Sequence, residues 1–223
     1  MTLQNEILGR LNDQLASMTP AAAAPVIHIV DDDASFLKAT SRWLRANGFK
    51  VQTFASAADF FSQRDPEASG CLVVDLQMPG MNGLELQAAL ARTSNPLATL
   101  FLTGHGDIAS SVRAMRNGAE DFLVKTAPKA ELLDAVRRAV TRDERERKTR
   151  VQRREATERI ETLTEREREV FGHVIRGRLN KQIADELCIA ERTVKCHRGN
   201  ITTKLGVPSV AELTQLAHAA GLL

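Results

Sequence analysis

Short apolar runs alternate with longer amphipathic stretches over the first two thirds of the chain. Between the runs, apolar residues recur at helical spacing. Because repeated strand–helix alternation places parallel strands in one sheet, residues 26–140 are predicted to form an α/β domain with helices on both faces of the sheet. The five predicted strands cover residues 26–30, 51–54, 71–74, 97–102 and 122–124.

The pattern over the last quarter of the chain is helical throughout. A capping-box signature at Thr164 begins a first helix, and Asn180 is expected to cap a second helix. A short turn at residues 188–190 leads to a third helix, and Ser209 begins a fourth. Residues 162–223 are therefore predicted to form an all-α domain of four helices.

Two further segments complete the chain. Residues 1–25 carry a narrow apolar stripe followed by an Ala-rich tract between Pro20 and Pro25. The stripe favours a helix that packs on its own domain or frays, and a short dimerising helix is the alternative. Residues 141–161 carry 8 basic and 6 acidic side chains and lack Gly and Pro, which favours a solvated helical linker over a disordered tether.

Length and charge agree with this division. The chain has 223 residues, enough for two ordinary domains, and a net charge of +2. Residues 162–223 carry 9 basic and 7 acidic side chains, a surplus that permits nucleic-acid binding without requiring it. The 3 cysteines are widely spaced, so neither a disulfide framework nor a zinc site is expected, and the protein is expected in a reducing cytoplasm. No run of 18 apolar residues occurs, so no membrane partner is expected.

Acidic, hydroxyl and amino side chains stand where the predicted strands end. Asp31 and Asp32 follow the first strand, and Asp75 follows the third. Thr103 ends the fourth strand and Lys125 follows the fifth. The carboxyl ends of parallel strands meet at one edge of a sheet, so these side chains are expected to converge. Three neighbouring carboxylates need a cation, and Mg²⁺ takes oxygen ligands of this kind. Asp75 is then the candidate acceptor of a phosphoryl group, whose charge Lys125 and Thr103 would neutralise.

The segments that carry these residues resemble the signature blocks of two-component receiver domains. The resemblance implies a flavodoxin-like, doubly wound sheet and phosphorylation of Asp75 by a sensor histidine kinase. It also implies Mg²⁺ held by Asp32 and Asp75, with Asp31 and the backbone carbonyl of Gln77 contributing. Phe122 is implied as a switch residue that turns inward when Thr103 moves toward the phosphoryl group. The resembling blocks are residues 29–33, 74–83, 102–106 and 122–125.

One position departs from the receiver pattern. Receivers usually follow the lysine with a proline joined by a cis bond, whereas Thr126 follows Lys125 here and Pro128 comes later. A cis bond before Thr would cost about 3–4 kcal/mol. We therefore expect either a trans bond with a rearranged loop or a strained cis bond held by its surroundings.

The C-terminal helices suit a helix-turn-helix, because a tight turn joins two helices and the second of these helices is basic. They resemble the LuxR-type DNA-binding domain, and together with the receiver they are similar to response regulators of the NarL/FixJ class. The blocks that carry the resemblance are residues 163–170, 180–184, 192–197 and 204–207.

Contacts with DNA are expected along the third helix of this domain. Lys195, His197 and Arg198 lie near its front and can reach base edges or phosphates. Cys196 is expected as a small neutral contact, and Gly199 is expected to permit close approach of the backbone to DNA. Apolar residues at core spacing are assigned no binding role; they are Val194, Ile201 and Leu205.

Other side chains are better placed for the DNA backbone. Lys181 begins the second helix of the domain, and Lys204 lies near the end of the third, so both are expected at phosphates. The positive end of the second helix, at Asn180, favours a phosphate as well.

The leading hypothesis is a transcriptional regulator that phosphorylation switches on. Receivers of the class pair through a face that corresponds here to about residues 107–140, so a homodimer on double-stranded DNA is expected, in contact with the transcription machinery. The alternative is a phosphorylation-independent DNA-binding or interaction protein with an inert receiver, which the Lys125–Thr126 junction favours. No enzyme of external metabolites is expected, because the receiver would catalyse only the phosphorylation and dephosphorylation of Asp75.

Overall fold

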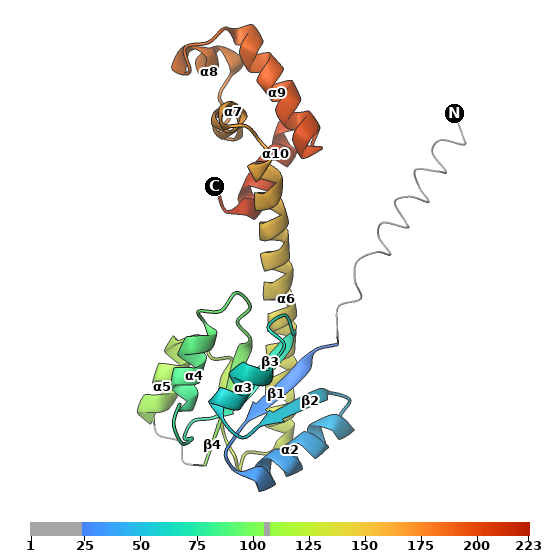
Figure 1. Ribbon diagram of the computed structural model, residues 1–223, viewed down its shortest axis with the longest axis vertical. Coiled ribbons are helices and arrows are strands. Elements are labelled where there is room, and N and C mark those ends of the chain that lie inside the picture. Colours follow the sequence, from blue (N-terminus) through green and yellow to red (C-terminus); the bar gives the residue numbers. More distant parts are fainter. Residues whose placement is uncertain (1–23, 105–107) are drawn as a thin grey trace, which may run out of the picture. The chain divides into compact units, whose positions relative to one another are not determined.

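The computed structural model describes residues 24–104 and 108–223, which divide after Arg145 into two compact units (Figure 1). Most of the N-terminal segment 1–25, with its expected apolar helix, lies outside the described residues. The end of the 102–106 block does as well.

The first unit is built on a five-stranded sheet in which every pair of neighbouring strands is parallel. The strand order is β2-β1-β3-β4-β5, which confirms the predicted flavodoxin-like topology. The order reverses between β1 and β3, so these two strands flank the point where such sheets bind ligands. The strands are β1 Val26–Val30, β2 Lys50–Phe54, β3 Gly70–Asp75, β4 Ala98–Thr103 and β5 Asp121–Val124.

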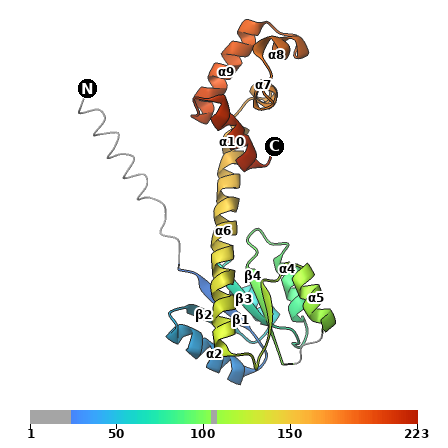
Figure 2. The same cartoon turned by 180° about the vertical axis from the view of Figure 1, so that it is seen from behind.

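Helices cover both faces of this sheet, because successive strand residues point to opposite sides. Val73 packs with residues of α2 and α6, whereas Leu72 and Val74 pack with residues of α3, α4 and α5. Figure 2 shows the start of α6 lying across the first of these faces. The helices are α2 Ala34–Ala46, α3 Ala57–Gln63, α4 Gly83–Leu90, α5 Ile108–Arg116 and α6 Lys129–Glu161.

Polar caps start the helices that follow β1, β2 and β3. The Asp33 carboxylate accepts hydrogen bonds from the N–H groups of Ser35 and Phe36 at the start of α2. Ser56 caps α3 through the N–H of Asp59, and Asn82 forms a reciprocal capping box with Glu85 at the start of α4. These caps end the strands and leave the acidic residues in the short loops between strand and helix.

The charged segment 141–161 is helical, as predicted, and forms the second part of α6. Arg154 and Glu158 make an i,i+4 ion pair of 2.8 Å. The segment is not uniformly solvated, however. Asp143 is buried and accepts a hydrogen bond of 2.9 Å from the N–H of Gly70, and Ile160 is buried in the core of the second unit. Both ends of the segment are therefore packed, each within its own unit.

Four helices follow in the second unit and confirm the predicted all-α domain: α7 Glu165–Ile175, α8 Asn180–Glu186, α9 Glu191–Leu205 and α10 Val210–Ala220. The prediction that Asn180 caps α8 is wrong. Asn180 is the first helical residue, and its side-chain oxygen accepts a hydrogen bond from Arg198. The N–H of Leu179, the residue at the cap position, donates a 2.9 Å hydrogen bond to the side-chain oxygen of Gln182.

Candidate functional site

Three aspartates meet at the point where the strand order reverses. Asp31 follows β1, Asp75 ends β3, and these strands are hydrogen-bonded neighbours. Together with Asp32, each offers a carboxylate oxygen, and the three oxygens lie within 4.8 Å of one another. Asp31 and Asp75 are buried while Asp32 is exposed, so the cluster opens to solvent on one side. The structure thus brings together the three residues that the strand ends predicted.

Lys125 reaches this cluster from the turn after β5. Its Nζ lies 2.7 Å from Oδ2 of Asp31 and 2.9 Å from Oδ2 of Asp75. Among the described residues no peptide bond is cis, so the Lys125–Thr126 bond is trans. The turn is closed by a 2.9 Å hydrogen bond from the N–H of Ala127 to the carbonyl of Val124. Thr126 in place of the usual proline therefore leaves the ammonium in contact with both acids.

The charges of the cluster shift one another's titration. Burial raises the pKa of Asp31, and the ammonium of Lys125 opposes part of that rise. Burial lowers the pKa of Lys125, but its hydrogen bonds to Asp31 and Asp75 outweigh that effect and raise it overall. One ammonium among three carboxylates leaves a surplus of negative charge. An oxygen-seeking divalent cation such as Mg²⁺ fits this donor set.

Thr103 ends β4 and Phe122 lies on β5, the two strands that follow β3 in the order of the sheet. Thr103 is 1% exposed, and its carbonyl accepts a 2.7 Å hydrogen bond from the N–H of Lys125, which ties the lysine turn to the end of β4. Phe122 is half-buried and stacks on Phe101, with ring centroids 5.9 Å apart. The backbone N–H of Gln77 donates to Oδ1 of Asp75 at 3.4 Å, which places the start of the following loop against the acceptor carboxyl.

The structure also adds two positioning residues that sequence reasoning missed. A Cβ at Gly83 would lie 2.4 Å from the carbonyl oxygen of Asp75, so only glycine allows α4 to begin this close to the site. The ring of Phe36 lies under Lys125, with Nζ 4.7 Å from its centroid. The capping box directly before Gly83 marks the helix start, but no sequence signal shows how near that start lies to Asp75.

In the second unit, α9 presents most of the residues predicted to contact DNA. Lys195, Cys196 and Gly199 are exposed, and His197 and Arg198 are half-buried. A Cβ at Gly199 would meet no atom within 4 Å, so packing of the chain does not demand glycine there. The expected core residues of this helix are buried, which confirms that prediction; they are Val194, Ile201 and Leu205.

Four of the predicted contact residues already have side-chain partners in the chain, among them Lys195, which lies 3.6 Å from the carboxylate of Glu191. Arg198 donates a 2.8 Å hydrogen bond to the side-chain oxygen of Asn180 and so links α9 to the start of α8. Lys204 pairs with the carboxylate of Glu167 at 2.7 Å, and this bond lowers the pKa of Glu167 to about 2. A phosphate would have to compete with Glu167 for the ammonium of Lys204. Lys181, by contrast, is exposed, and no ion pair is seen for it within the described residues.

Comparison with known proteins agrees with this geometry. Residues 27–137 match the family model for the response regulator receiver domain, and residues 161–217 match that for bacterial regulatory proteins of the luxR family. Nodulation protein W of Bradyrhizobium diazoefficiens is 38% identical over 204 residues, which is 92% of this chain and 90% of that protein. The chain belongs to the response regulators of the NarL/FixJ class.

Other relatives of this response regulator extend the likeness along nearly its whole length. The response regulator protein TodT of Pseudomonas putida is 41% identical over 195 residues, covering 87% of this chain and 86% of that protein. The solved structure of the response regulator StyR is 44% identical, with a TM-score of 0.75, and covers 88% of this chain and 99% of that chain. The family consists of transcriptional regulators, not metabolic enzymes. Within the described residues, no helix is both long and apolar enough to cross a bilayer.

Proposed function

We propose that a sensor histidine kinase phosphorylates Asp75, and that the phosphorylated protein binds double-stranded DNA as a homodimer and regulates transcription. The observation that carries the proposal is the meeting of Asp31 and Asp75 on the ammonium of Lys125 at the β1–β3 switch point. A buried carboxylate beside further acids and a fixed cation suits an acceptor for a strongly anionic group.

Each neighbour of Asp75 has a part in this chemistry. An oxygen of Asp75 forms a bond to phosphorus as the bond from phosphorus to the kinase histidine breaks, and the histidine nitrogen keeps the electron pair. The Lys125 ammonium, already 2.9 Å from this carboxylate, then neutralises a phosphoryl oxygen, and the Thr103 hydroxyl binds another. The protein's own chemistry is limited to this transfer and to hydrolysis of the product, with no external metabolite as substrate.

A magnesium ion belongs to the proposal. The carboxylates of Asp31, Asp32 and Asp75 would hold it, with the backbone carbonyl of Gln77 as a further oxygen ligand. Bound Mg²⁺ supplies positive charge to the phosphoryl oxygens, which otherwise face three aspartates.

An exposed apolar stripe supports pairing of two receivers. Ile108, Val112 and Met115 follow helical spacing on α5 and are 83%, 43% and 48% exposed. Large apolar side chains gathered on one helix face gain free energy when a partner covers them. The stripe lies within the 107–140 face, which also holds Phe122 on β5, the switch residue of the proposal.

The remaining parts of the proposal concern DNA. We place the receiver at residues 26–140, the linker at 141–161 and the DNA-binding domain at 162–223. Because the proposed target is chromosomal DNA, we expect the protein in the cytoplasm. Helix α9 would enter the major groove, and two domains would engage half-sites about one helical turn apart. The proposed contact residues are Asn180, Lys181, Lys195, Cys196, His197, Arg198, Gly199 and Lys204.

The test measures mass by light scattering and DNA affinity by anisotropy, in Mg²⁺, with and without beryllium fluoride as a phosphoryl mimic. The wild type is expected to dimerise and bind DNA more tightly with the mimic, whereas Asp75→Asn is expected to ignore it. Glu67→Gln, a matched change at an exposed carboxylate, should respond like the wild type. Dimeric DNA binding that is equal with and without the mimic would instead establish the phosphorylation-independent alternative.

A further inference from the structure

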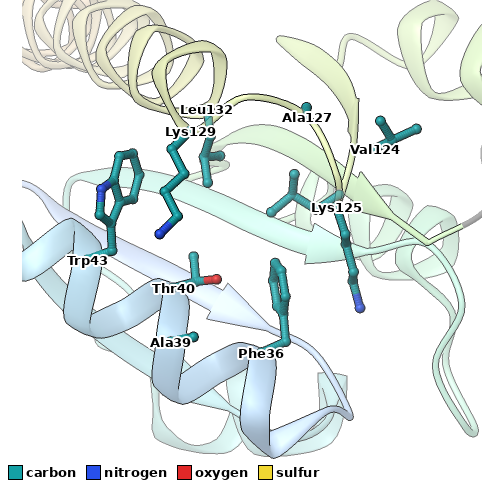
Figure 3. A pocket seen from close by; sticks show the side chains of 10 residues that line it. Phe36, Ala39, Thr40, Trp43, Val124, Lys125, Ala127, Lys129 and Leu132 are labelled. Carbon is teal, nitrogen blue, oxygen red and sulfur yellow. The ribbon is translucent and has the colours of Figure 1, made fainter.

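A second pocket lies beside the acceptor site, between α2, the end of the sheet and the start of α6 (Figure 3). Its volume is about 160 Å³, and its walls include Phe36 and Trp43 from α2, Leu102 from β4 and Leu132 from α6. An apolar protein cavity of about 150 Å³ is large enough to hold benzene. The pocket therefore has the size and the walls to hold one aromatic ring.

Two polar groups mark one side of this pocket. Thr40 is only 8% exposed, its hydroxyl points into the cavity, and it makes no hydrogen bond within the part of the chain that the structure describes. The Lys129 side chain extends over Trp43, with Nζ 5.9 Å from the ring centroid, and no carboxylate of the described residues pairs with it. The Thr40 hydroxyl is open to the cavity and can donate a hydrogen bond to an acceptor on a ligand.

The charge of the ligand follows from these groups. Two lysines line the pocket, Lys125 and Lys129, and no acidic side chain of the described residues does. The Lys125 ammonium is already held by Asp31 and Asp75, which leaves Lys129 to pair with an anion. An apolar cavity with a few convergent polar groups is the usual form of a small-molecule site.

We propose that this pocket binds a small monocyclic aromatic carboxylate. The ring would lie against Phe36 and Trp43, while the carboxylate accepts a hydrogen bond from Thr40 and pairs with Lys129. The stem of Lys125 forms part of the same wall, so a bound ligand would touch the side chain that contacts Asp75. Binding itself requires neither phosphorylation nor DNA, and the proposal can therefore fail while the phosphoryl switch stands, and the reverse.

Trp43 allows a direct test, because it is the only tryptophan of the chain and lines the pocket. Benzoate is titrated into the full-length protein, and fluorescence excited at the tryptophan edge is followed. Benzamide and benzylamine serve as neutral and cationic probes of nearly the same shape. We expect a saturable signal with benzoate in or below the millimolar range, and binding at least about tenfold weaker for both other probes, which is the effect of one charge-assisted hydrogen bond.

Three variants separate the pocket from non-specific binding. Lys129→Met and Thr40→Val should each weaken benzoate binding by about five- to tenfold or more, with little change for benzamide in Lys129→Met. Lys38→Met, at an exposed position of α2 outside the pocket, should leave benzoate affinity unchanged. The exposed site of Lys129 keeps that variant folded even if Thr40→Val unfolds. Equal binding of the three probes, equal effects of Lys129→Met and Lys38→Met, or no saturable signal would overturn the proposal.

Discussion

Acidification should destabilise the receiver through one buried histidine. His28 stands in the middle of β1 with no exposed surface. Its ring stacks on Phe54 at 6.0 Å between centroids and meets the edge of Phe60 at 5.7 Å. Burial lowers the pKa of His28 from 6.5 to about 4, and the nearby charge of Arg64 acts in the same direction.

The sign and size follow from proton linkage. Between the two pKa values the unfolded chain binds a proton at His28 and the folded chain does not, so stability is present above the unfolded pKa of 6.5 and is lost as the pH falls toward 4. With these values, the free energy of unfolding falls by about 2 kcal/mol between pH 7 and pH 5, and by about 3 kcal/mol once both states are protonated.

The assay is urea unfolding at pH 7 and pH 5, followed by the fluorescence of Trp43, which lies in the same unit as His28. The wild type should lose about 2 kcal/mol more than His28→Leu over this interval, whatever the stability of the variant at pH 7. Because both proteins share every other titrating group, only the difference between the two losses is read. His218→Gln, at an exposed position of α10, should behave like the wild type. Equal losses in the wild type and His28→Leu would refute the reasoning.

Three further outcomes are expected. Gly83→Ala should lower the free energy of unfolding of the receiver in urea by about 1–3 kcal/mol, because the added methyl group would lie 2.4 Å from the carbonyl oxygen of Asp75. Gly104→Ala, with open space at that position, should change the free energy of unfolding little. Equal effects of the two variants would contradict this prediction. Asp143→Ala should lower the free energy of unfolding by about 1.5–3 kcal/mol, because it removes a buried hydrogen bond to a carboxylate. Asp134→Ala, at an exposed position, should lower it by almost nothing. A loss below about 0.5 kcal/mol for Asp143→Ala, the size of a surface effect, would count against the prediction. Lys195→Ala should lower the salt slope of DNA binding by about 1 if the ammonium contacts a phosphate, and an unchanged slope would exclude that contact.

Most of the architecture was predictable because it depends on local pattern. Strands β1, β3 and β4 are buried along nearly their whole length, and the sequence shows each of them as a short run rich in apolar residues. The convergence of Asp31, Asp75 and Lys125 was predictable for a related reason, since in a parallel sheet the end of a strand fixes which edge its next residue occupies.

Side-chain partners over long sequence distances were not predictable. Asn180 is of a residue type that often caps helices. Only the packing of α9 on α8 shows that its side-chain oxygen instead accepts a hydrogen bond from Arg198, 18 residues away. Asp143 lies in a run of charged residues that is typical of a solvated helix. In the structure it is buried and accepts a hydrogen bond from the N–H of Gly70, which is 73 residues away in the sequence.

The sequence by itself determined the two folds, the acidic edge of the sheet and the position of the basic helix α9, because apolar periodicity, caps and strand ends are local properties of the chain. Only the tertiary structure decided that, with a trans bond before Thr126, the Lys125 ammonium contacts both Asp31 and Asp75. The same holds for Thr40 and Lys129, which line one cavity. These contacts depend on the distances between α2, the turn after β5 and α6. The volumes of the side chains packed between these elements set those distances.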